Sequence, residues 1–131
     1  MTPLTFSRNE RLHHRKAIQK VFKTGKGWYA HPVRILCMRE ESEVPMQLRL
    51  MVTVPSRNFK KAVTRNLLKR RMREAYRRNK PVVADMFAGQ RGAMDIVLIY
   101  TAKEVCTFHE IEKGILAGIQ YIHKHSGLVA E

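Results

Sequence analysis

The amino-acid sequence predicts an α+β protein in which helices pack on a small mixed sheet. Three observations lead to this prediction. Apolar and polar residues alternate along residues 28–39 and 46–54, as they do in half-buried strands. Residues 61–76 contain no glycine or proline and are rich in helix-forming side chains. Residues 93–100 end in a continuous apolar run, which is typical of a strand buried on both faces.

A first helix is expected near the N-terminal end of the chain. Ser7 and Glu10 form the capping-box pattern S-x-x-E, so the helix should begin near Arg8. Gly25 or Gly27 should end it, because glycine is common just after the last turn of a helix. The polar positions of this segment are mostly basic, which predicts a positively charged outer face.

Two strands are expected next, and together they predict an antiparallel hairpin. Residues 28–39 alternate apolar and polar side chains, and Pro32 places the beginning of that strand at a sheet edge or a bulge. Residues 40–45 are acidic and turn-like. Residues 46–54 alternate again, and Pro55 ends the second strand.

The second half of the chain should add a long helix, a third strand and a last helix. Pro81 stops the long helix, and residues 82–87 are compatible with a short helical segment. After the third strand, Thr107 and Glu110 repeat the capping-box pattern and open a last helix, which should end near residues 126–127. The resulting order α-β-β-α-β-α is that of an α+β sandwich.

Positive charge dominates the composition. The 131 residues include 25 Lys and Arg against 11 Asp and Glu, a formal net charge of +14. This balance predicts an anionic partner, with nucleic acid first and an anionic membrane surface a distant second. No apolar run approaches the roughly 18 residues of a membrane span, and the N-terminus has no signal-peptide core. We therefore expect a cytoplasmic protein without a membrane partner, with one domain over residues 1–131 and an ordered core of about residues 4–125.

The sequence offers no recognisable set of catalytic or metal-binding groups. Cys37 and Cys106 stand alone among apolar neighbours, so we expect reduced core residues and no disulfide or metal site. Asp85 and Asp95 are isolated acids. The glutamates of residues 40–43 are compatible with a hard cation or with plain solubility. The paired histidines near the two ends lack the spacing of zinc ligands.

The most distinctive stretch is residues 57–80, which hold 11 of the 25 basic residues and one acid, Glu74. At about 100° per residue, the polar positions of this predicted helix form a stripe. The stripe consists of Arg65, Asn66, Lys69, Arg70, Arg73 and Arg77. Like charges at this spacing repel one another by a few tenths of a kcal/mol per pair. A stripe without interleaved acids predicts a polyanionic partner; the alternative is a solvated helix face.

Binding to RNA is therefore the main functional hypothesis. RNA is favoured over duplex DNA because the sequence contains no helix-turn-helix, zinc-finger or zipper pattern. A non-enzymatic RNA-binding protein of the ribosomal or RNA-chaperone type would explain the charge equally well. A protein nuclease that acts alone is disfavoured, because no Ser-His-Asp, Cys-His or P-loop pattern and no cluster of acids is found.

Two motifs resemble those of a known family. The run Arg65-Asn66-x-x-Lys69-Arg70-x-x-Arg73-Glu74 resembles the hallmark helix of the protein subunit of bacterial ribonuclease P. The opening Phe6-Ser7-Arg8-x-x-Arg11-Leu12, with Val21-Phe22 further on, resembles the first helix of that family. The resemblance extends over about residues 4–125 and implies a fold like that of ribosomal protein S5 domain 2.

The resemblance implies a function as well as a fold. Ribonuclease P removes the 5′ leader from precursor tRNA by endonucleolytic cleavage, and its RNA subunit is the catalyst and holds the required Mg²⁺. The protein subunit would then contribute no catalytic side chain and bind no cofactor of its own. Its expected partners are the catalytic RNA and precursor tRNA, and no protein partner is predicted.

Particular residues are assigned to these contacts through the resemblance. The catalytic RNA is expected to contact Arg57, Lys60, Lys61, Arg65, Asn66, Lys69, Arg70, Arg73 and Arg77. A cleft between the first helix and the sheet would bind the single-stranded leader through Arg11, His14, Ile18, Phe22 and Leu36. From the residues alone, His14 is either a phosphate contact or an ordinary surface histidine. Ile18 and Leu36 replace frequent aromatics, Ser56 a common lysine and Leu67 a frequent arginine.

Overall fold

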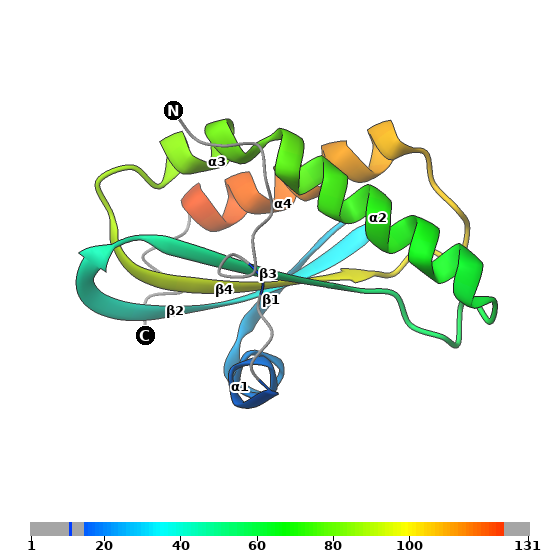
Figure 1. Cartoon of the computed structure of the whole chain (residues 1–131), viewed down its shortest axis with the longest axis horizontal. Helices are drawn as coiled ribbons and strands as arrows, with labels where there is room; N and C mark the ends of the chain where they lie inside the picture. The colour runs from blue at the N-terminus through cyan, green and yellow to red at the C-terminus, as the bar shows by residue number, and fades with distance from the viewer. Residues whose placement is uncertain (1–10, 12–14, 125–131) are drawn as a thin grey trace.

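The computed structural model describes residue 11 and residues 15–124, which form four strands and four helices (Figure 1). The elements are α1 (Arg15–Thr24), β1 (Lys26–Ala30), β2 (Val33–Pro45), β3 (Gln47–Thr53), α2 (Ala62–Arg78), α3 (Lys80–Met86), β4 (Arg91–Tyr100) and α4 (Phe108–Lys124). The strands form one mixed sheet in the order β1-β2-β4-β3. This arrangement confirms the predicted α+β class.

The two faces of the sheet are covered unequally. Of the helices that the structure describes, α2, α3 and α4 lie on one side and α1 lies on the other (Figure 1). On the side of the three helices, Leu50, Ile96 and Leu98 belong to the main buried cluster. On the side of α1, Val21 and Val97 belong to a second, smaller cluster. The described part of the chain therefore forms a thick helical layer on one face and one short helix on the other.

The predicted alternation of the strands is confirmed. In β4, Ile96 and Leu98 face the three-helix layer while Val97 faces α1, so the apolar run is buried on both faces. In β3, Leu50 belongs to the main cluster, and Met51 packs against the smaller cluster. Periodicity alone therefore assigned these side chains to the correct faces.

The predicted hairpin between the second and third strands is wrong. Strand β4 lies between β2 and β3, antiparallel to β2 and parallel to β3. The physical reason lies in the composition of β4, whose apolar side chains on both faces suit an interior position with hydrogen-bonded neighbours on both edges. Strand β3 carries polar residues such as Gln47 and Arg49 and takes an edge position.

The predicted strand over residues 28–39 is in fact two strands. Strand β1 ends at Ala30 and β2 begins at Val33, with a turn at His31 and Pro32 between them. The strands pair antiparallel, with Trp28 opposite Ile35. Proline has no N–H for the ladder, which fits its place in a turn, and β1 is an edge strand. The acidic segment that was expected to be a turn continues β2 as far as Pro45.

The first helix begins later than predicted. Arg11 forms an isolated parallel bridge with Leu50 on edge strand β3, so residue 11 is extended, and α1 begins at Arg15. A bridge of this kind covers part of the free edge of β3. Helix α1 ends at Thr24, immediately before Gly25, as expected. The capping pair Ser7–Glu10 and the predicted end of the last helix lie outside the described residues.

The second capping box is confirmed at the start of α4. The backbone N–H of Glu110 donates to the Thr107 hydroxyl, and the backbone N–H of Thr107 donates to the Glu110 carboxylate, each over 3.2 Å. The Glu110 carboxylate also accepts from the Thr107 hydroxyl, and the two hydrogen bonds that it accepts from Thr107 lower its pKa. The segment after α2 forms the short helix α3, as expected. Within residue 11 and residues 15–124, no helix is long and apolar enough to cross a bilayer.

Helix α4 approaches the sheet closely through its glycines, and this contact can be tested. A Cβ at Gly114 would overlap the backbone carbonyl oxygen of His31. We expect Gly114→Ala to lower the free energy of unfolding by about 1–3 kcal/mol, because the overlap forces helix and turn apart. In an open helix the same change would stabilise by up to about 1 kcal/mol.

Urea denaturation followed by circular dichroism measures this difference. The matched control is Ala117→Gly on the exposed side of the same helix. It should cost about 1 kcal/mol through helix propensity alone. A Gly114→Ala protein as stable as the wild type would contradict the close approach.

Candidate nucleic-acid interface

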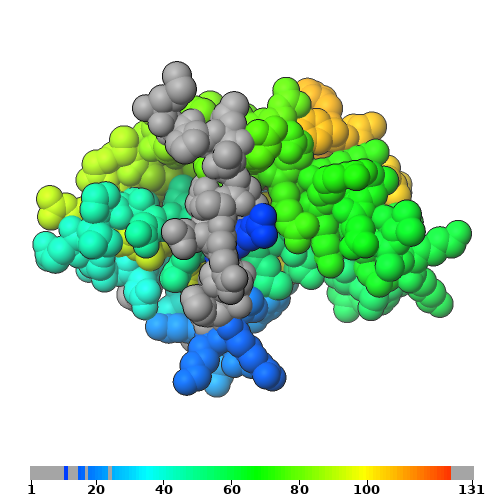
Figure 2. Space-filling model, in the orientation of Figure 1, coloured from blue at the N-terminus to red at the C-terminus, as the bar shows by residue number. Residues whose placement is uncertain are grey.

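Helix α2 has an apolar stripe that fixes its orientation on the sheet. The stripe consists of Leu68, Met72, Ala75 and Tyr76, all of which are buried. The opposite side of the helix faces solvent and carries five polar residues, which we call the basic ridge. The basic ridge consists of Asn66, Lys69, Arg70, Arg73 and Arg77. In Figure 2 the side chains of α2 and of the segment before it, in green, cover the right of the visible face.

Three cations of the basic ridge have no acidic partner among the described residues. Arg70 and Arg73 are exposed, Lys69 is half-buried, and no carboxylate of the described chain pairs with any of them. The fourth cation, Arg77, forms an ion pair with Glu74, and this contact lowers the pKa of Glu74. A phosphate would have to compete with Glu74 for Arg77. The ridge therefore presents at least three charges that are ready for an external anion.

Arg65 is turned toward its own chain. Its Nη1 donates to the carbonyl oxygens of Phe59 and Lys60 at 2.7 and 2.9 Å. These bonds hold the segment before α2 against the first turn of the helix. The same segment carries the exposed cations Arg57, Lys60 and Lys61. Arg65 thus positions three of the predicted RNA contacts, a role that its place in the charge stripe did not indicate.

Two arginines outside the predicted set attach α2 to its neighbours. Arg71 donates from Nη1 to the carbonyl oxygen of Cys106 over 2.6 Å, and the guanidinium of Arg78 lies 5.3 Å from the ring centroid of Phe108. A spacing of seven residues places both on the same side of α2. Their charges therefore serve the packing of α2 on the start of α4.

The predicted leader cleft is distributed between buried and open positions. Ile18 packs against the small cluster that contains Leu36, and Leu36 is only 7% exposed. Phe22, in contrast, is 49% exposed on α1. Arg11 is exposed, and His14 lies outside the described residues. Ile18, Phe22 and Leu36 thus lie on the α1 side of the sheet. Leu36 packs between the sheet and α1, so it offers little surface to a ligand.

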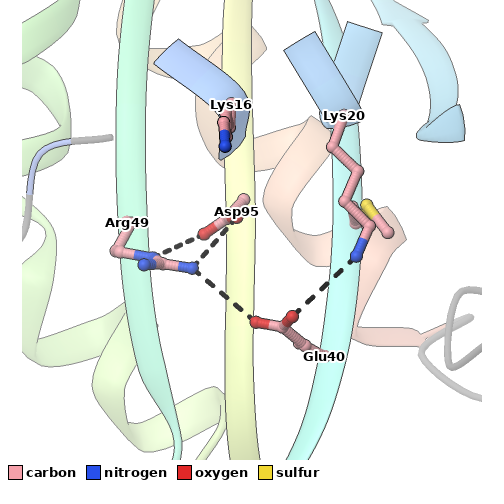
Figure 3. A pocket seen from close by; sticks show the side chains of 6 residues that line it. Lys16, Lys20, Glu40, Arg49 and Asp95 are labelled. Atoms are coloured by element: carbon pink, nitrogen blue, oxygen red, sulfur yellow. Dashed lines mark hydrogen bonds and ion pairs between the residues drawn. The ribbon is translucent and has the colours of Figure 1, made fainter. Parts of the chain in front are cut away.

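A pocket of about 160 Å³ lies beside α1, on the same side of the sheet (Figure 3). Lys16, Lys20, Met38, Glu40, Arg49 and Asp95 line it. Arg49 makes two hydrogen bonds to the Asp95 carboxylate, at 2.6 and 3.1 Å. Glu40 lies 4.0 Å from Arg49 and 3.9 Å from the Lys20 ammonium, which links α1 to three strands. The lining has three cations and two carboxylates, so it carries a small excess of positive charge.

Asp95 is not the isolated acid that the sequence indicated. Arg49 and Asp95 are register partners on the parallel strands β3 and β4, so their side chains meet on the α1 face. Burial raises the pKa of Asp95, and the hydrogen bonds from Arg49 offset part of this effect. The sequence contained no signal for this pair, because the pairing of β3 with β4 brings together residues 46 positions apart.

Fold and surface together define a class of protein: a small, basic α+β protein with a helix whose cations face solvent. The family described as Ribonuclease P matches residues 6–122. A "Ribonuclease P protein component" from Porphyromonas gingivalis is 31% identical over 116 residues, which is 87% of this chain and 85% of that protein. The corresponding protein of Microcystis aeruginosa is 30% identical over 119 residues, 88% of this chain and 94% of that protein.

A solved structure of the RNase P protein from Thermotoga maritima is also similar. Its sequence is 31% identical, and the two structures superpose with a TM-score of 0.66. The aligned region covers 86% of this chain and 97% of that one. The chain therefore belongs to the family of ribonuclease P proteins. It is a protein subunit of the endoribonuclease of tRNA 5′ maturation, and membership implies association with the RNA subunit. None of these findings favours a ribosomal or chaperone protein.

The pocket in Figure 3 gives a prediction about pH. A folded-state pKa above the unfolded value means that ionisation of Asp95 is less favourable in the folded protein. The contribution of Asp95 to stability is therefore fully present below the ordinary pKa of 3.8 and is lost as the pH rises through the raised pKa. The stability of the wild type relative to Asp95→Asn should accordingly fall with rising pH.

Urea denaturation of both proteins over a series of pH values measures this difference. All other titrating groups are shared, so they cancel in the comparison. If the wild type instead became more stable relative to Asp95→Asn as the pH rises, the prediction would be contradicted. The attraction of Arg49 for the ionised carboxylate would then outweigh the effect of burial.

Proposed function

We propose that this subunit assists its catalytic RNA by binding two RNA surfaces at once. The basic ridge of α2 docks on the catalytic RNA, and the α1 side of the sheet holds the 5′ leader of precursor tRNA. The observation that supports this division is the placement of α2 and α1 on opposite sides of the sheet (Figure 1). One small protein can therefore contact both RNAs without either blocking the other.

The ridge suits a folded RNA because it combines fixed geometry with unpaired charge. Lys69, Arg70 and Arg73 project from a helix that packing holds in place, and Asn66 adds an amide that can hydrogen-bond to sugar or base. Each phosphate that a cation neutralises releases counterions from the RNA. The segment held by Arg65 extends the same positive surface.

The α1 side suits a single strand because it offers an apolar surface next to cations. Phe22 presents a half-exposed ring, and bases of any sequence stack on such rings. Lys16 and Lys20 lie on the same helix and can contact the sugar-phosphate backbone of the single-stranded leader. Mature tRNA lacks a leader, so these contacts would favour precursor over product. Individual RNA contacts remain predictions.

Cleavage itself is assigned to the RNA subunit and its Mg²⁺ ions. The protein's contribution is to bring two polyanions together. A net charge of +14 between the catalytic RNA and its substrate would reduce their repulsion and lower the magnesium concentration that the reaction needs. We expect this reaction to take place in the cytoplasm.

The role of the basic ridge is tested by the salt dependence of binding to the catalytic RNA. Arg70→Ala with Arg73→Ala should weaken binding and flatten the slope of log K against log salt by about 0.7–0.9 per lost contact. The matched control is Arg91→Ala, which removes an exposed charge of β4 that lies near Glu43. Its slope should stay close to that of the wild type. Equal slopes for all three proteins would remove α2 from the interface.

The role of α1 is tested by comparing precursor and mature tRNA. In the assembled holoenzyme, Phe22→Ala should weaken binding of precursor tRNA by about 1–3 kcal/mol, the usual range for one lost base stack. Binding of mature tRNA should not change. Val82→Ala, which truncates an exposed apolar residue of α3 in the opposite layer, serves as the control. Equal losses for both tRNAs would exclude a leader site at Phe22.

A further inference from the structure

Three potential metal ligands meet at one end of the sheet. A ring nitrogen of His31, a carboxylate oxygen of Glu104 and the Sγ of Cys106 all lie within 4.8 Å of one another. His31 comes from the turn between β1 and β2, while Glu104 and Cys106 come from the loop between β4 and α4. Because Cys106 stands alone among apolar neighbours in the sequence, no metal site was expected there, but the pairing of β2 with β4 brings the turn and the loop together.

Hydrogen bonds hold the turn and the loop against each other. The backbone N–H and the hydroxyl of Thr101 both donate to the carbonyl oxygen of Pro32, at 2.9 and 3.1 Å. Next to them, Val33 pairs with Tyr100 in the ladder of β2 and β4. The backbone beside His31 is therefore fixed relative to the beginning of the loop.

The loop is fixed at Cys106 as well. The Tyr100 hydroxyl donates to the carbonyl oxygen of Glu104 and accepts from the backbone N–H of Cys106 over 2.9 Å. On its other side, the carbonyl oxygen of Cys106 accepts from Arg71 of α2 over 2.6 Å. A buried cysteine anchored through both backbone groups is held in place before any ion arrives.

We propose that His31, Glu104 and Cys106 bind a divalent transition-metal ion, for which zinc is the best match. Sulfur, imidazole nitrogen and carboxylate oxygen are the three ligand types that zinc uses in proteins. Bond lengths of 2.0–2.3 Å place tetrahedral ligands about 3.3–3.8 Å apart. His31 and Glu104 are exposed, so their side chains can rotate. Rotations that move their ligand atoms by about 1 Å would bring all three ligands to bonding distance without backbone movement.

The surroundings of His31, and a comparison of the two cysteines, support this role. The Tyr29 hydroxyl lies 3.2 Å from Nδ1 of His31, which leaves Nε2 for the ion. The other cysteine, Cys37, provides a contrast within the same chain. It is fully buried in the core, and burial raises the pKa of its thiol to about 12. Cys37 is therefore expected to remain a thiol and to bind no ion.

A bound ion would join the turn and the loop beneath α2. Arg71 of α2 is hydrogen-bonded to this loop, so the ion would stabilise the loop against which α2, the helix with the basic ridge, packs. Three protein ligands leave the fourth position of a tetrahedral site for water. Metal binding at this site needs no RNA and can be measured on the protein alone.

Cobalt(II) chloride is the probe, because a bound thiolate gives cobalt a charge-transfer absorption in the near ultraviolet. The full-length chain, freed of metal with a chelator, should bind one cobalt ion with this absorption, and zinc chloride should displace it. A large excess of magnesium chloride should not displace the cobalt, because Mg²⁺ prefers oxygen ligands. Zinc should also raise the melting temperature, since it binds the folded state.

Variants identify the ligands. Cys106→Ser and His31→Ala should each weaken binding at least about 100-fold, since even loss of a group that supports a ligand costs 10–100-fold. His109→Ala, which removes an exposed histidine at the start of α4, should bind as the wild type does. The Cys37→Ala protein should keep the absorption. No absorption in the wild type, or equal affinity in wild type and Cys106→Ser, would overturn the proposal. If Cys106→Ser fails to fold, the spectrum of Cys37→Ala still decides, because Cys106 is then its only thiol.

Discussion

The packing of the apolar stripe of α2 on the sheet determines how this protein presents its charge. Once that stripe is buried, the direction of every other side chain on the helix is set by the helical repeat. One flank then reaches the start of α4, where Arg71 and Arg78 make internal contacts. The basic ridge is left facing solvent. The cations of α2 therefore fall into a group that holds the fold together and a group that is available to RNA.

The same principle organises the other side of the molecule. Strand β4 is buried on both faces, so each face of the sheet needs a cover. Three helices cover one face, and α1 covers only part of the other (Figure 1). Phe22 is half-exposed on α1, and the charged pocket of Figure 3 lies next to Lys16 and Lys20 of the same helix. The proposed division between an RNA-docking layer and a substrate side thus rests on how unequally the sheet is covered.

Local pattern predicted much of this structure, and long-range pairing decided the rest. The presence of the helices, the faces of the strands and the capping box at Thr107 depend on neighbours a few residues away, so local pattern was sufficient for them. The position of β4 between β2 and β3 depends on competition among strands, and the hairpin prediction failed there. The pair of Arg49 with Asp95 and the cluster around Cys106 exist only because of that pairing. Arg65 was placed correctly on the helix, but its bonds to the preceding segment depend on a loop conformation that no pattern revealed.

The most direct measurement of the central claim is reconstitution of precursor tRNA cleavage at low magnesium. Three reactions are compared: the catalytic RNA alone, the RNA with this protein, and the protein alone. If the subunit acts by holding two RNAs together, it should accelerate cleavage by the RNA and should leave the precursor intact by itself. Cleavage by the protein alone, or no acceleration of its cognate RNA, would contradict the account.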